Sequence, residues 1–199
     1  MRTSLRTILV GLITLFLVFL VYFIPDTSIH RGFGSAVSVE NIIALSEQEQ
    51  ARFGLPTRLK IPSINIDTPI EYVGLTSDGA MGAPKERANV AWFDLGPRPG
   101  ESGSAVISGH YGRQNWKGSV FDDLHKLRKG DKIYIEDFNG QVVSFEVREN
   151  RRYDPNEDAL EVFGSSDGKS HLNLITCEGV WDESIQQYPK RLVVFTDKE

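Results

Sequence analysis

The stretch KIYIEDFNGQVVSFEV, residues Lys132–Val147, contains the clearest fold signal in the chain. Two segments of alternating apolar and polar residues flank the dipeptide Asn139-Gly140. Asn-Gly between alternating segments is the strongest short-range signal for a β-hairpin. The stretch therefore predicts two antiparallel strands joined by a tight turn.

Similar short segments, rich in β-branched and aromatic residues, occur on both sides of this hairpin, separated by Gly, Pro, Asn and Asp. This pattern is typical of an all-β domain. The predicted strands are Arg58–Ile66, Pro69–Leu75, Asn89–Phe93, Ala105–Ser108, Lys132–Ile135, Val142–Arg152, Leu172–Thr176 and Arg191–Thr196. Eight strands of this kind indicate a barrel or a sandwich. The apolar spacing in Val120–Leu127 (VFDDLHKL) adds one short helix.

The segment Ile8–Ile24 is almost wholly apolar, and its 17 uncharged residues reach the lower limit for a transmembrane helix. Arg2 and Arg6 precede it, and positively charged flanks remain in the cytoplasm. We therefore predict an uncleaved signal anchor that leaves the rest of the chain outside. A cleaved signal peptide is the alternative, but the apolar run exceeds the usual length of about 7–15 residues.

Composition restricts the classes of function. The chain has 199 residues, of which 40% are hydrophobic and 25% charged, as in ordinary globular proteins. This length fits one domain with an appendage. The formal net charge is −5, so no positive field attracts nucleic acid, and we predict no nucleic-acid partner.

Three residues that can carry chemistry lie at the ends of predicted strands. His110 follows one strand, Cys177 follows another, and Arg191 opens the last. Cys177 is the only cysteine, so an intramolecular disulfide is ruled out, and the simplest alternative is a buried, inert thiol. A reactive cysteine needs a cationic neighbour that favours the thiolate. His110 and Arg191 are the candidate cations.

The motifs around these residues resemble those of sortases, the cysteine transpeptidases of Gram-positive-type cell surfaces. The similar motifs are SGH at Ser108–His110, LITC at Leu174–Cys177, and the arginine 14 residues after the cysteine. The resemblance covers about Leu55 to the C-terminus. The GPRPGE stretch and the TCEGVWD arrangement at Thr176–Asp182 are most similar to class F.

The sequence departs from the family pattern at two places. Asn173 stands where the family often has threonine, and Tyr111-Gly112 follows the histidine where class F is expected to have Val-Asp. Neither departure touches the three candidate catalytic residues. The second affects the assignment to class F and the expected shape of the cleft rim.

The resemblance implies a closed eight-stranded β-barrel with short helices and a specific chemistry. Cys177 would attack a peptide carbonyl and form a thioester. His110 would move the proton, and Arg191 would donate hydrogen bonds to the substrate backbone or the developing oxyanion. We expect no cofactor and no metal. Thr176, Trp181 and Tyr188 are predicted to bind substrate, and the alternative for each is a packing role.

The implied substrate is a C-terminal sorting signal of the Leu-Pro-x-Thr-Gly type, transferred to the amine of a cell-wall peptide. The predicted organisation is then a cytoplasmic N-terminus (1–7), a transmembrane anchor (8–24), an extracytoplasmic stalk (25–54) and a catalytic domain (55–199). Three alternatives remain at this point. They are a membrane-anchored cysteine hydrolase, a pilin-polymerising sortase whose acceptor is a lysine, and a non-catalytic anchored β-domain.

Overall fold

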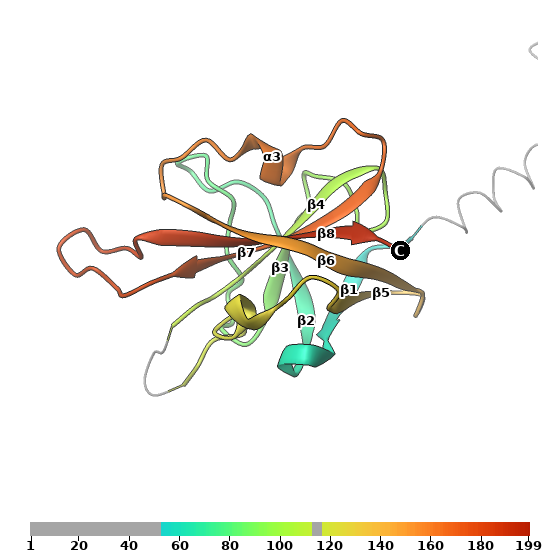
Figure 1. Cartoon of the computed structure of the whole chain (residues 1–199), viewed down its shortest axis with the longest axis horizontal. Helices are drawn as coiled ribbons and strands as arrows, with labels where there is room; N and C mark the ends of the chain where they lie inside the picture. The colour runs from blue at the N-terminus through green and yellow to red at the C-terminus, as the bar shows by residue number, and fades with distance from the viewer. Residues whose placement is uncertain (1–52, 113–116) are drawn as a thin grey trace, which may run out of the picture. The chain divides into compact units, whose positions relative to one another are not determined.

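The computed structural model describes residues 53–112 and 117–199 (Figure 1). These described residues form eight strands: β1 Pro56–Ile61, β2 Ile66–Val73, β3 Val90–Phe93, β4 Gly103–Gly109, β5 Lys132–Asp137, β6 Val142–Tyr153, β7 Ser170–Glu178 and β8 Lys190–Lys198. The short helical elements are η1 Pro62–Ile64, η2 Leu124–Lys126 and α3 Leu160–Phe163. The predicted anchor and residues 25–52 of the predicted stalk lie outside the described residues. None of the helices that the structure describes has the length and apolar character needed to cross a membrane.

The strands close into a barrel in the order β1-β2-β3-β4-β7-β8-β6-β5, and pairing of β5 with β1 completes the ring. The β2–β3 and β4–β7 pairs are parallel, and the other pairs are antiparallel. The predicted all-β barrel is confirmed, and the sandwich alternative is wrong.

The predicted hairpin forms between β5 and β6. Gly140 has a φ of +77°, which glycine adopts without strain. The Asp137 carboxylate accepts the backbone N–H groups of Asn139 and Gln141, each at 2.8 Å. Local turn chemistry therefore fixes this part of the barrel, as the sequence predicts.

The prediction of one strand over Arg58–Ile66 is wrong, because the chain turns back in the middle of it. Pro62 begins the 3₁₀ turn η1; proline lacks the N–H that a continuing strand would need. Asn65 then adopts a left-handed conformation with φ of 54°. The second strand consequently starts at Ile66 rather than at Pro69, and Ile61 pairs with Ile66.

The helix predicted over Val120–Leu127 is reduced to the three-residue turn η2. A segment of this length is too short to gain stability from helical hydrogen bonds alone. Its apolar residues still fill the barrel, since Phe121, Leu124 and Leu127 are completely buried. Helix α3, which has only four residues, shows no periodicity that the sequence analysis could detect.

Strands β4, β7 and β8 are buried on both faces. Ile107, Leu174 and Val194 point into the barrel core, while Val106 and Val193 pack outside it against Val162 of α3. This two-sided burial explains why these strands are nearly continuous apolar runs. The three strands thus form a wall that is packed on both sides, and they position the candidate site.

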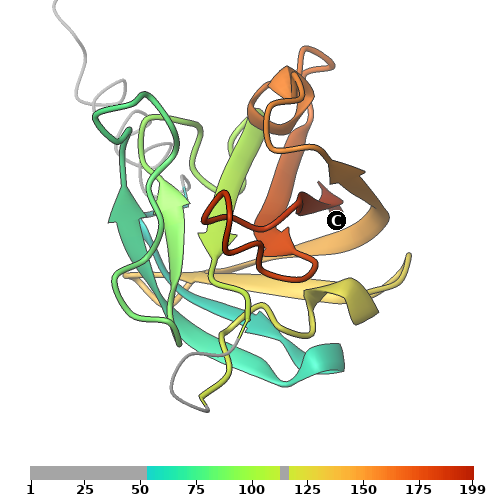
Figure 2. The ribbon, with the colours of Figure 1, turned by 90° about the vertical axis from the view of Figure 1, so that its left-hand side faces the viewer.

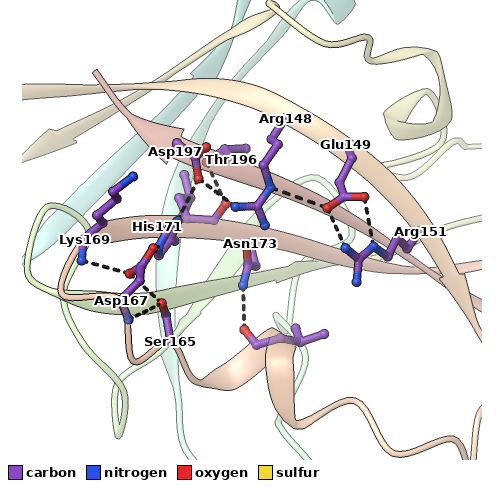
Figure 3. Close-up of polar contacts among 12 residues, drawn as sticks. Arg148, Glu149, Arg151, Ser165, Asp167, Lys169, His171, Asn173, Thr196 and Asp197 are labelled. Atoms are coloured by element: carbon purple, nitrogen blue, oxygen red, sulfur yellow. Dashed lines mark hydrogen bonds and ion pairs between the residues drawn. The ribbon is translucent and has the colours of Figure 1, made fainter.

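A charged cluster around His171 anchors the connection between β6 and β7 (Figure 3). The His171 side chain is 7% exposed, and its ring nitrogens lie 2.8 Å from Asp197 and 3.1 Å from Asp167. A neutral imidazole has one N–H and can donate to only one carboxylate, whereas the protonated ring can donate to both. Asn173 donates its amide to the Val162 carbonyl at 2.7 Å and so holds α3.

Replacing His171 with leucine is expected to lower the thermal midpoint, because Asp167 and Asp197 lose a hydrogen-bonding partner. Both carboxylates are partly exposed, so water replaces part of the lost interaction and the expected decrease is modest. The exposed His125, changed to glutamine, provides the control and is expected to leave the midpoint almost unchanged. Thermal unfolding followed by circular dichroism measures both. An unchanged midpoint in His171→Leu would contradict the anchoring role.

The same variant is expected to change the acid stability. The Lys169 backbone N–H, His171 and Ser165 all hydrogen-bond to Asp167 and hold its pKa well below the ordinary value. A carboxyl group whose pKa is lower in the folded protein than in the unfolded chain stabilises the fold at a pH above its unfolded pKa. This stabilisation is lost as the pH falls through the folded pKa. His171→Leu should therefore lose less stability than the unchanged protein when the pH falls below about 4.

Candidate active site

The ends of three strands bring the predicted catalytic residues together. β4 runs parallel to β7, so His110, directly after β4, lies at the same end of the sheet as Cys177 of β7. β8 runs antiparallel to β7, and Arg191 at its start is the direct cross-strand partner of Cys177. Figures 1 and 2 show the connections after β4 and β7 at this end of the barrel.

A pocket of about 800 Å³ opens at this point. All six residues that the sequence analysis assigned to the site line it: His110, Thr176, Cys177, Trp181, Tyr188 and Arg191. The other lining residues are Ala80, Met81, Gly82, Ala83, Arg87, Ser108, Gly109, Tyr111 and Ile175. The predicted residues thus belong to one site.

Gly109 and Pro84 fix the position of His110. A Cβ atom at Gly109 would lie 2.4 Å from the ring of the buried Phe121. A residue with a side chain therefore does not fit at this position. His110 Nε2 lies 2.8 Å from the Pro84 carbonyl oxygen. A carbonyl only accepts hydrogen bonds, so Nε2 carries the hydrogen. Nδ1 is therefore the ring atom that is available to exchange a proton.

Thr176 links the two strands that carry His110 and Cys177. Its hydroxyl donates to the Gly109 carbonyl at 2.7 Å, and the residue is 4% exposed. This hydrogen bond joins the residue before the cysteine to the residue before the histidine. Thr176 thereby couples the positions of both candidate catalytic groups.

Burial and charge have opposite effects on the Cys177 thiol. Desolvation by burial raises the pKa of Cys177, and the Arg191 guanidinium lowers it by a smaller amount. The net effect is a pKa above the ordinary value for Cys177. The cationic support that we expected is present in Arg191, but burial outweighs it.

Backbone carbonyls hold the Arg191 guanidinium in place. Its Nη1 donates to the carbonyls of Tyr188 and Lys190, each at 3.1 Å. Arg191 also lines the pocket together with Cys177. The arginine is therefore oriented before any substrate arrives.

Aromatic side chains cover one side of the pocket. The ring of Tyr188 makes edge-to-face contacts with Tyr111 and Trp181, with centroids 5.4 and 5.1 Å apart. A Cβ atom at Gly112, which has a φ of +85°, would lie 2.1 Å from the Tyr188 hydroxyl. Tyr111-Gly112, a departure from the family pattern, therefore allows Tyr188 to pack on this rim.

A family model for the sortase domain matches residues 59–199, which is well over half of the chain. The chain belongs to the sortase family. The match includes all the strands from β2 onward and every residue of the predicted site. The further prediction of class F within the family stays a prediction.

Similar proteins carry the same family name. The sortase is 31% identical over 140 residues to Sortase A of Bacillus anthracis, across 70% of this chain and 58% of that protein. It is 29% identical over 149 residues to Sortase A of Streptococcus agalactiae, across 73% and 56% of the two chains. It therefore spans less than two thirds of the length of these relatives. Sortase C-1 from Actinomyces oris superimposes with a TM-score of 0.58 and 26% identity, across 72% of this sortase and 73% of that chain.

A second hollow of about 560 Å³ adjoins the first and shares Ala80, Met81, Ile175 and Arg191 with it. Apolar side chains from β3 and α3 line it, among them Phe93, Leu160 and Phe163. This groove was not predicted from the sequence, because the groove depends on how α3 lies against the barrel. Arg87, which lines the pocket around Cys177 from the connection between β2 and β3, was not predicted either.

Proposed function

We propose that this sortase is a cysteine transpeptidase that cleaves a sorting signal and joins the released acyl group to an amine. The observation that carries the proposal is the arrangement of three groups in one pocket. Cys177 faces Arg191 across two paired strands, and His110 lines the same cavity. A nucleophile, a proton carrier and a fixed donor are the groups that acyl transfer needs.

In the first step, His110 takes the proton of the Cys177 thiol, and the sulfur attacks the peptide carbonyl. The new C–S bond forms as the carbonyl becomes a tetrahedral oxyanion. The C–N bond then breaks, and the imidazolium of His110 gives its proton to the leaving amine. The products of this step are a thioester on Cys177 and a free peptide amine.

In the second step, an incoming amine attacks the thioester carbonyl. Neutral His110 accepts a proton from the attacking nitrogen, and the C–S bond breaks to release an amide. The proton returns to the sulfur, so the thiol and the neutral histidine are restored. Every proton that leaves one group is accepted by another, and no cofactor takes part.

Arg191 stabilises the oxyanion or holds the substrate backbone in both steps. Arginine remains charged at any physiological pH and presents a planar set of donors. Its contacts with the Tyr188 and Lys190 carbonyls orient this plane before reaction. Donors that are fixed in advance stabilise the transition state without a cost for reorganisation.

The apolar groove beside α3 is suited to the residues that precede the cleaved bond. A Leu-Pro segment is apolar, and Phe93, Leu160 and Phe163 provide an apolar surface that adjoins the pocket. Trp181 and Tyr188 line the pocket itself and are proposed to line the path of the substrate. The hydroxyl of Thr176 is used within the protein, so we assign this residue a positioning role.

The predicted anchor at residues 8–24 would place the catalytic domain at the outer surface of the cell membrane. Sorting-signal proteins and cell-wall peptides would then share one thin layer with the enzyme. Confinement of both partners raises their effective concentration without any new contact. We therefore propose surface-protein anchoring to a wall peptide as the biological role.

The decisive experiment supplies the full chain, in detergent, with a Leu-Pro-x-Thr-Gly peptide and increasing amounts of a glycine-type amine. Mass spectrometry should show a joined product whose fraction rises with amine concentration and with pH up to about 8, as more amine becomes neutral. Only hydrolysed acid at every amine concentration, with the thioester trapped on Cys177, would establish the hydrolase alternative. A lysine side-chain amine that was strongly preferred would favour the pilin-polymerising alternative.

A further inference from the structure

The catalytic pocket is positively charged, although the chain as a whole is acidic. Its lining contains Arg87, His110 and Arg191 but no aspartate or glutamate among the described residues. The whole chain has a formal net charge of −5. A cleft lined by one sign of charge concentrates ligands of the opposite sign. This distribution indicates that one substrate carries a negative charge into the pocket.

Arg87 is held rigidly by one end of its guanidinium. Its Nη2 lies 3.1 Å from the Tyr111 carbonyl, 2.7 Å from the Gly112 carbonyl and 2.6 Å from the Ser119 hydroxyl. Its Nε is buried without a hydrogen-bond partner. Its Nη1 makes no hydrogen bond within residues 53–112 and 117–199. Arg87 therefore lines the pocket with a fixed guanidinium whose Nη1 is not used by any of the residues that the structure describes.

The roles assigned to His110, Cys177 and Arg191 do not require this second arginine. Arg191 is the cation that acts on the Cys177 thiol, whereas the charge of Arg87 acts on the Tyr188 hydroxyl. Arg87 also holds the two residues that directly follow His110. Arg87 is thereby attached to the segment that directly follows His110, and both residues line the same pocket.

We propose that Arg87 binds a free carboxylate on the incoming acceptor amine, which defines the acceptor as an amino-acid-type amine rather than a simple alkylamine. The inference rests on the proposed transpeptidation. The leaving amine of a cleaved signal continues into a peptide, so it has no free carboxylate beside it. The acceptor is the other partner that meets His110, and its carboxylate would complement the unused donor.

The test compares two small acceptors, glycine and glycinamide, which differ in the carboxylate. Both are supplied with the same sorting-signal peptide to the full chain and to an Arg87→Gln variant. Glutamine retains an N–H donor for the Tyr111 and Gly112 carbonyls but lacks the charge. The two acceptors also differ in amine basicity, but this difference is the same for every variant. The measured quantity is therefore the ratio of kcat/KM for glycine to that for glycinamide.

Arg87→Gln should lower this ratio by about tenfold, since a charge-assisted hydrogen bond is lost for glycine alone. Lys85→Gln serves as the matched control: Lys85 is exposed, lies two residues away and does not line the pocket. It should leave the ratio unchanged. An equal loss for both acceptors in Arg87→Gln would show a purely structural role and overturn the inference. The inference would also be wrong if the change in this ratio in Arg87→Gln depended on an acidic residue in the donor peptide.

A binding measurement separates this inference from the proposed function. N-acetylglycine carries the carboxylate but no reactive amine, and nuclear magnetic resonance of arginine-labelled protein can follow its binding. The Arg87 guanidinium signal is identified by its absence from the spectrum of Arg87→Gln, and saturable shifts of this signal would support the carboxylate site even if no amine were ever joined. Absence of those shifts, with joined product still formed from glycine, would reject the site and leave transpeptidation standing.

Discussion

Cys177→Ala is expected to abolish acyl transfer completely while the barrel still folds. The reaction as proposed passes through a thioester, and alanine offers no nucleophile in its place. The residue is only partly buried, at the pocket end of β7, so removing one sulfur atom leaves the core packing of the barrel intact. We therefore expect a product yield at background level and a thermal midpoint close to that of the unchanged protein.

His110→Ala provides the companion measurement. This change removes the proton carrier and the hydrogen bond to the Pro84 carbonyl, so activity should fall to background with a modest loss of stability. Mass spectrometry of the peptide products and circular dichroism melting curves together separate chemistry from folding. Joined product in Cys177→Ala, at any acceptor concentration, would remove Cys177 from its assigned role.

Local signals in the sequence predict much of this barrel. The Asn139-Gly140 turn and the alternating segments beside it correctly predict the hairpin, because neighbouring residues alone determine that geometry. The break between β1 and β2 was missed, since Pro62 stops the strand inside an apolar pattern that continues without interruption. Helix α3 is held by the contact of Val162 with Asn173, a long-range interaction without a local signature.

The candidate site, like the fold, can be predicted from the sequence only where local motifs determine it. His110, Cys177 and Arg191 could be predicted because each stands at a strand end within a recognisable motif, and the register of β7 and β8 brings two of them together. Arg87 could not be predicted, because it lies in a loop and is held at the pocket by contacts with residues distant in the sequence, namely Tyr111, Gly112 and Ser119. The burial that raises the Cys177 pKa likewise depends on the closed barrel.

Arg191→Lys is expected to reduce kcat/KM by about a hundredfold or more, the scale on which the loss of an oxyanion donor acts. Lysine retains the positive charge but has a single ammonium on a flexible stem and cannot donate in a plane. It also cannot keep the contacts with the Tyr188 and Lys190 carbonyls while it points a second donor toward the substrate. Wild-type turnover in this variant, with an unchanged thermal midpoint, would show that the assigned role is wrong.

Alkylation of Cys177 by iodoacetamide distinguishes the charge of Arg191 from its hydrogen bonds. Only the thiolate reacts, so the rate follows the ionisation of Cys177. The positive charge of Arg191 lowers the pKa of this thiol, so Arg191→Gln should move the alkylation profile to higher pH. Arg191→Lys retains the charge and should leave the profile in place although its turnover is lost. If Arg191→Lys instead moved the alkylation profile to higher pH and lost turnover to the same extent, the arginine would act through its charge on the sulfur.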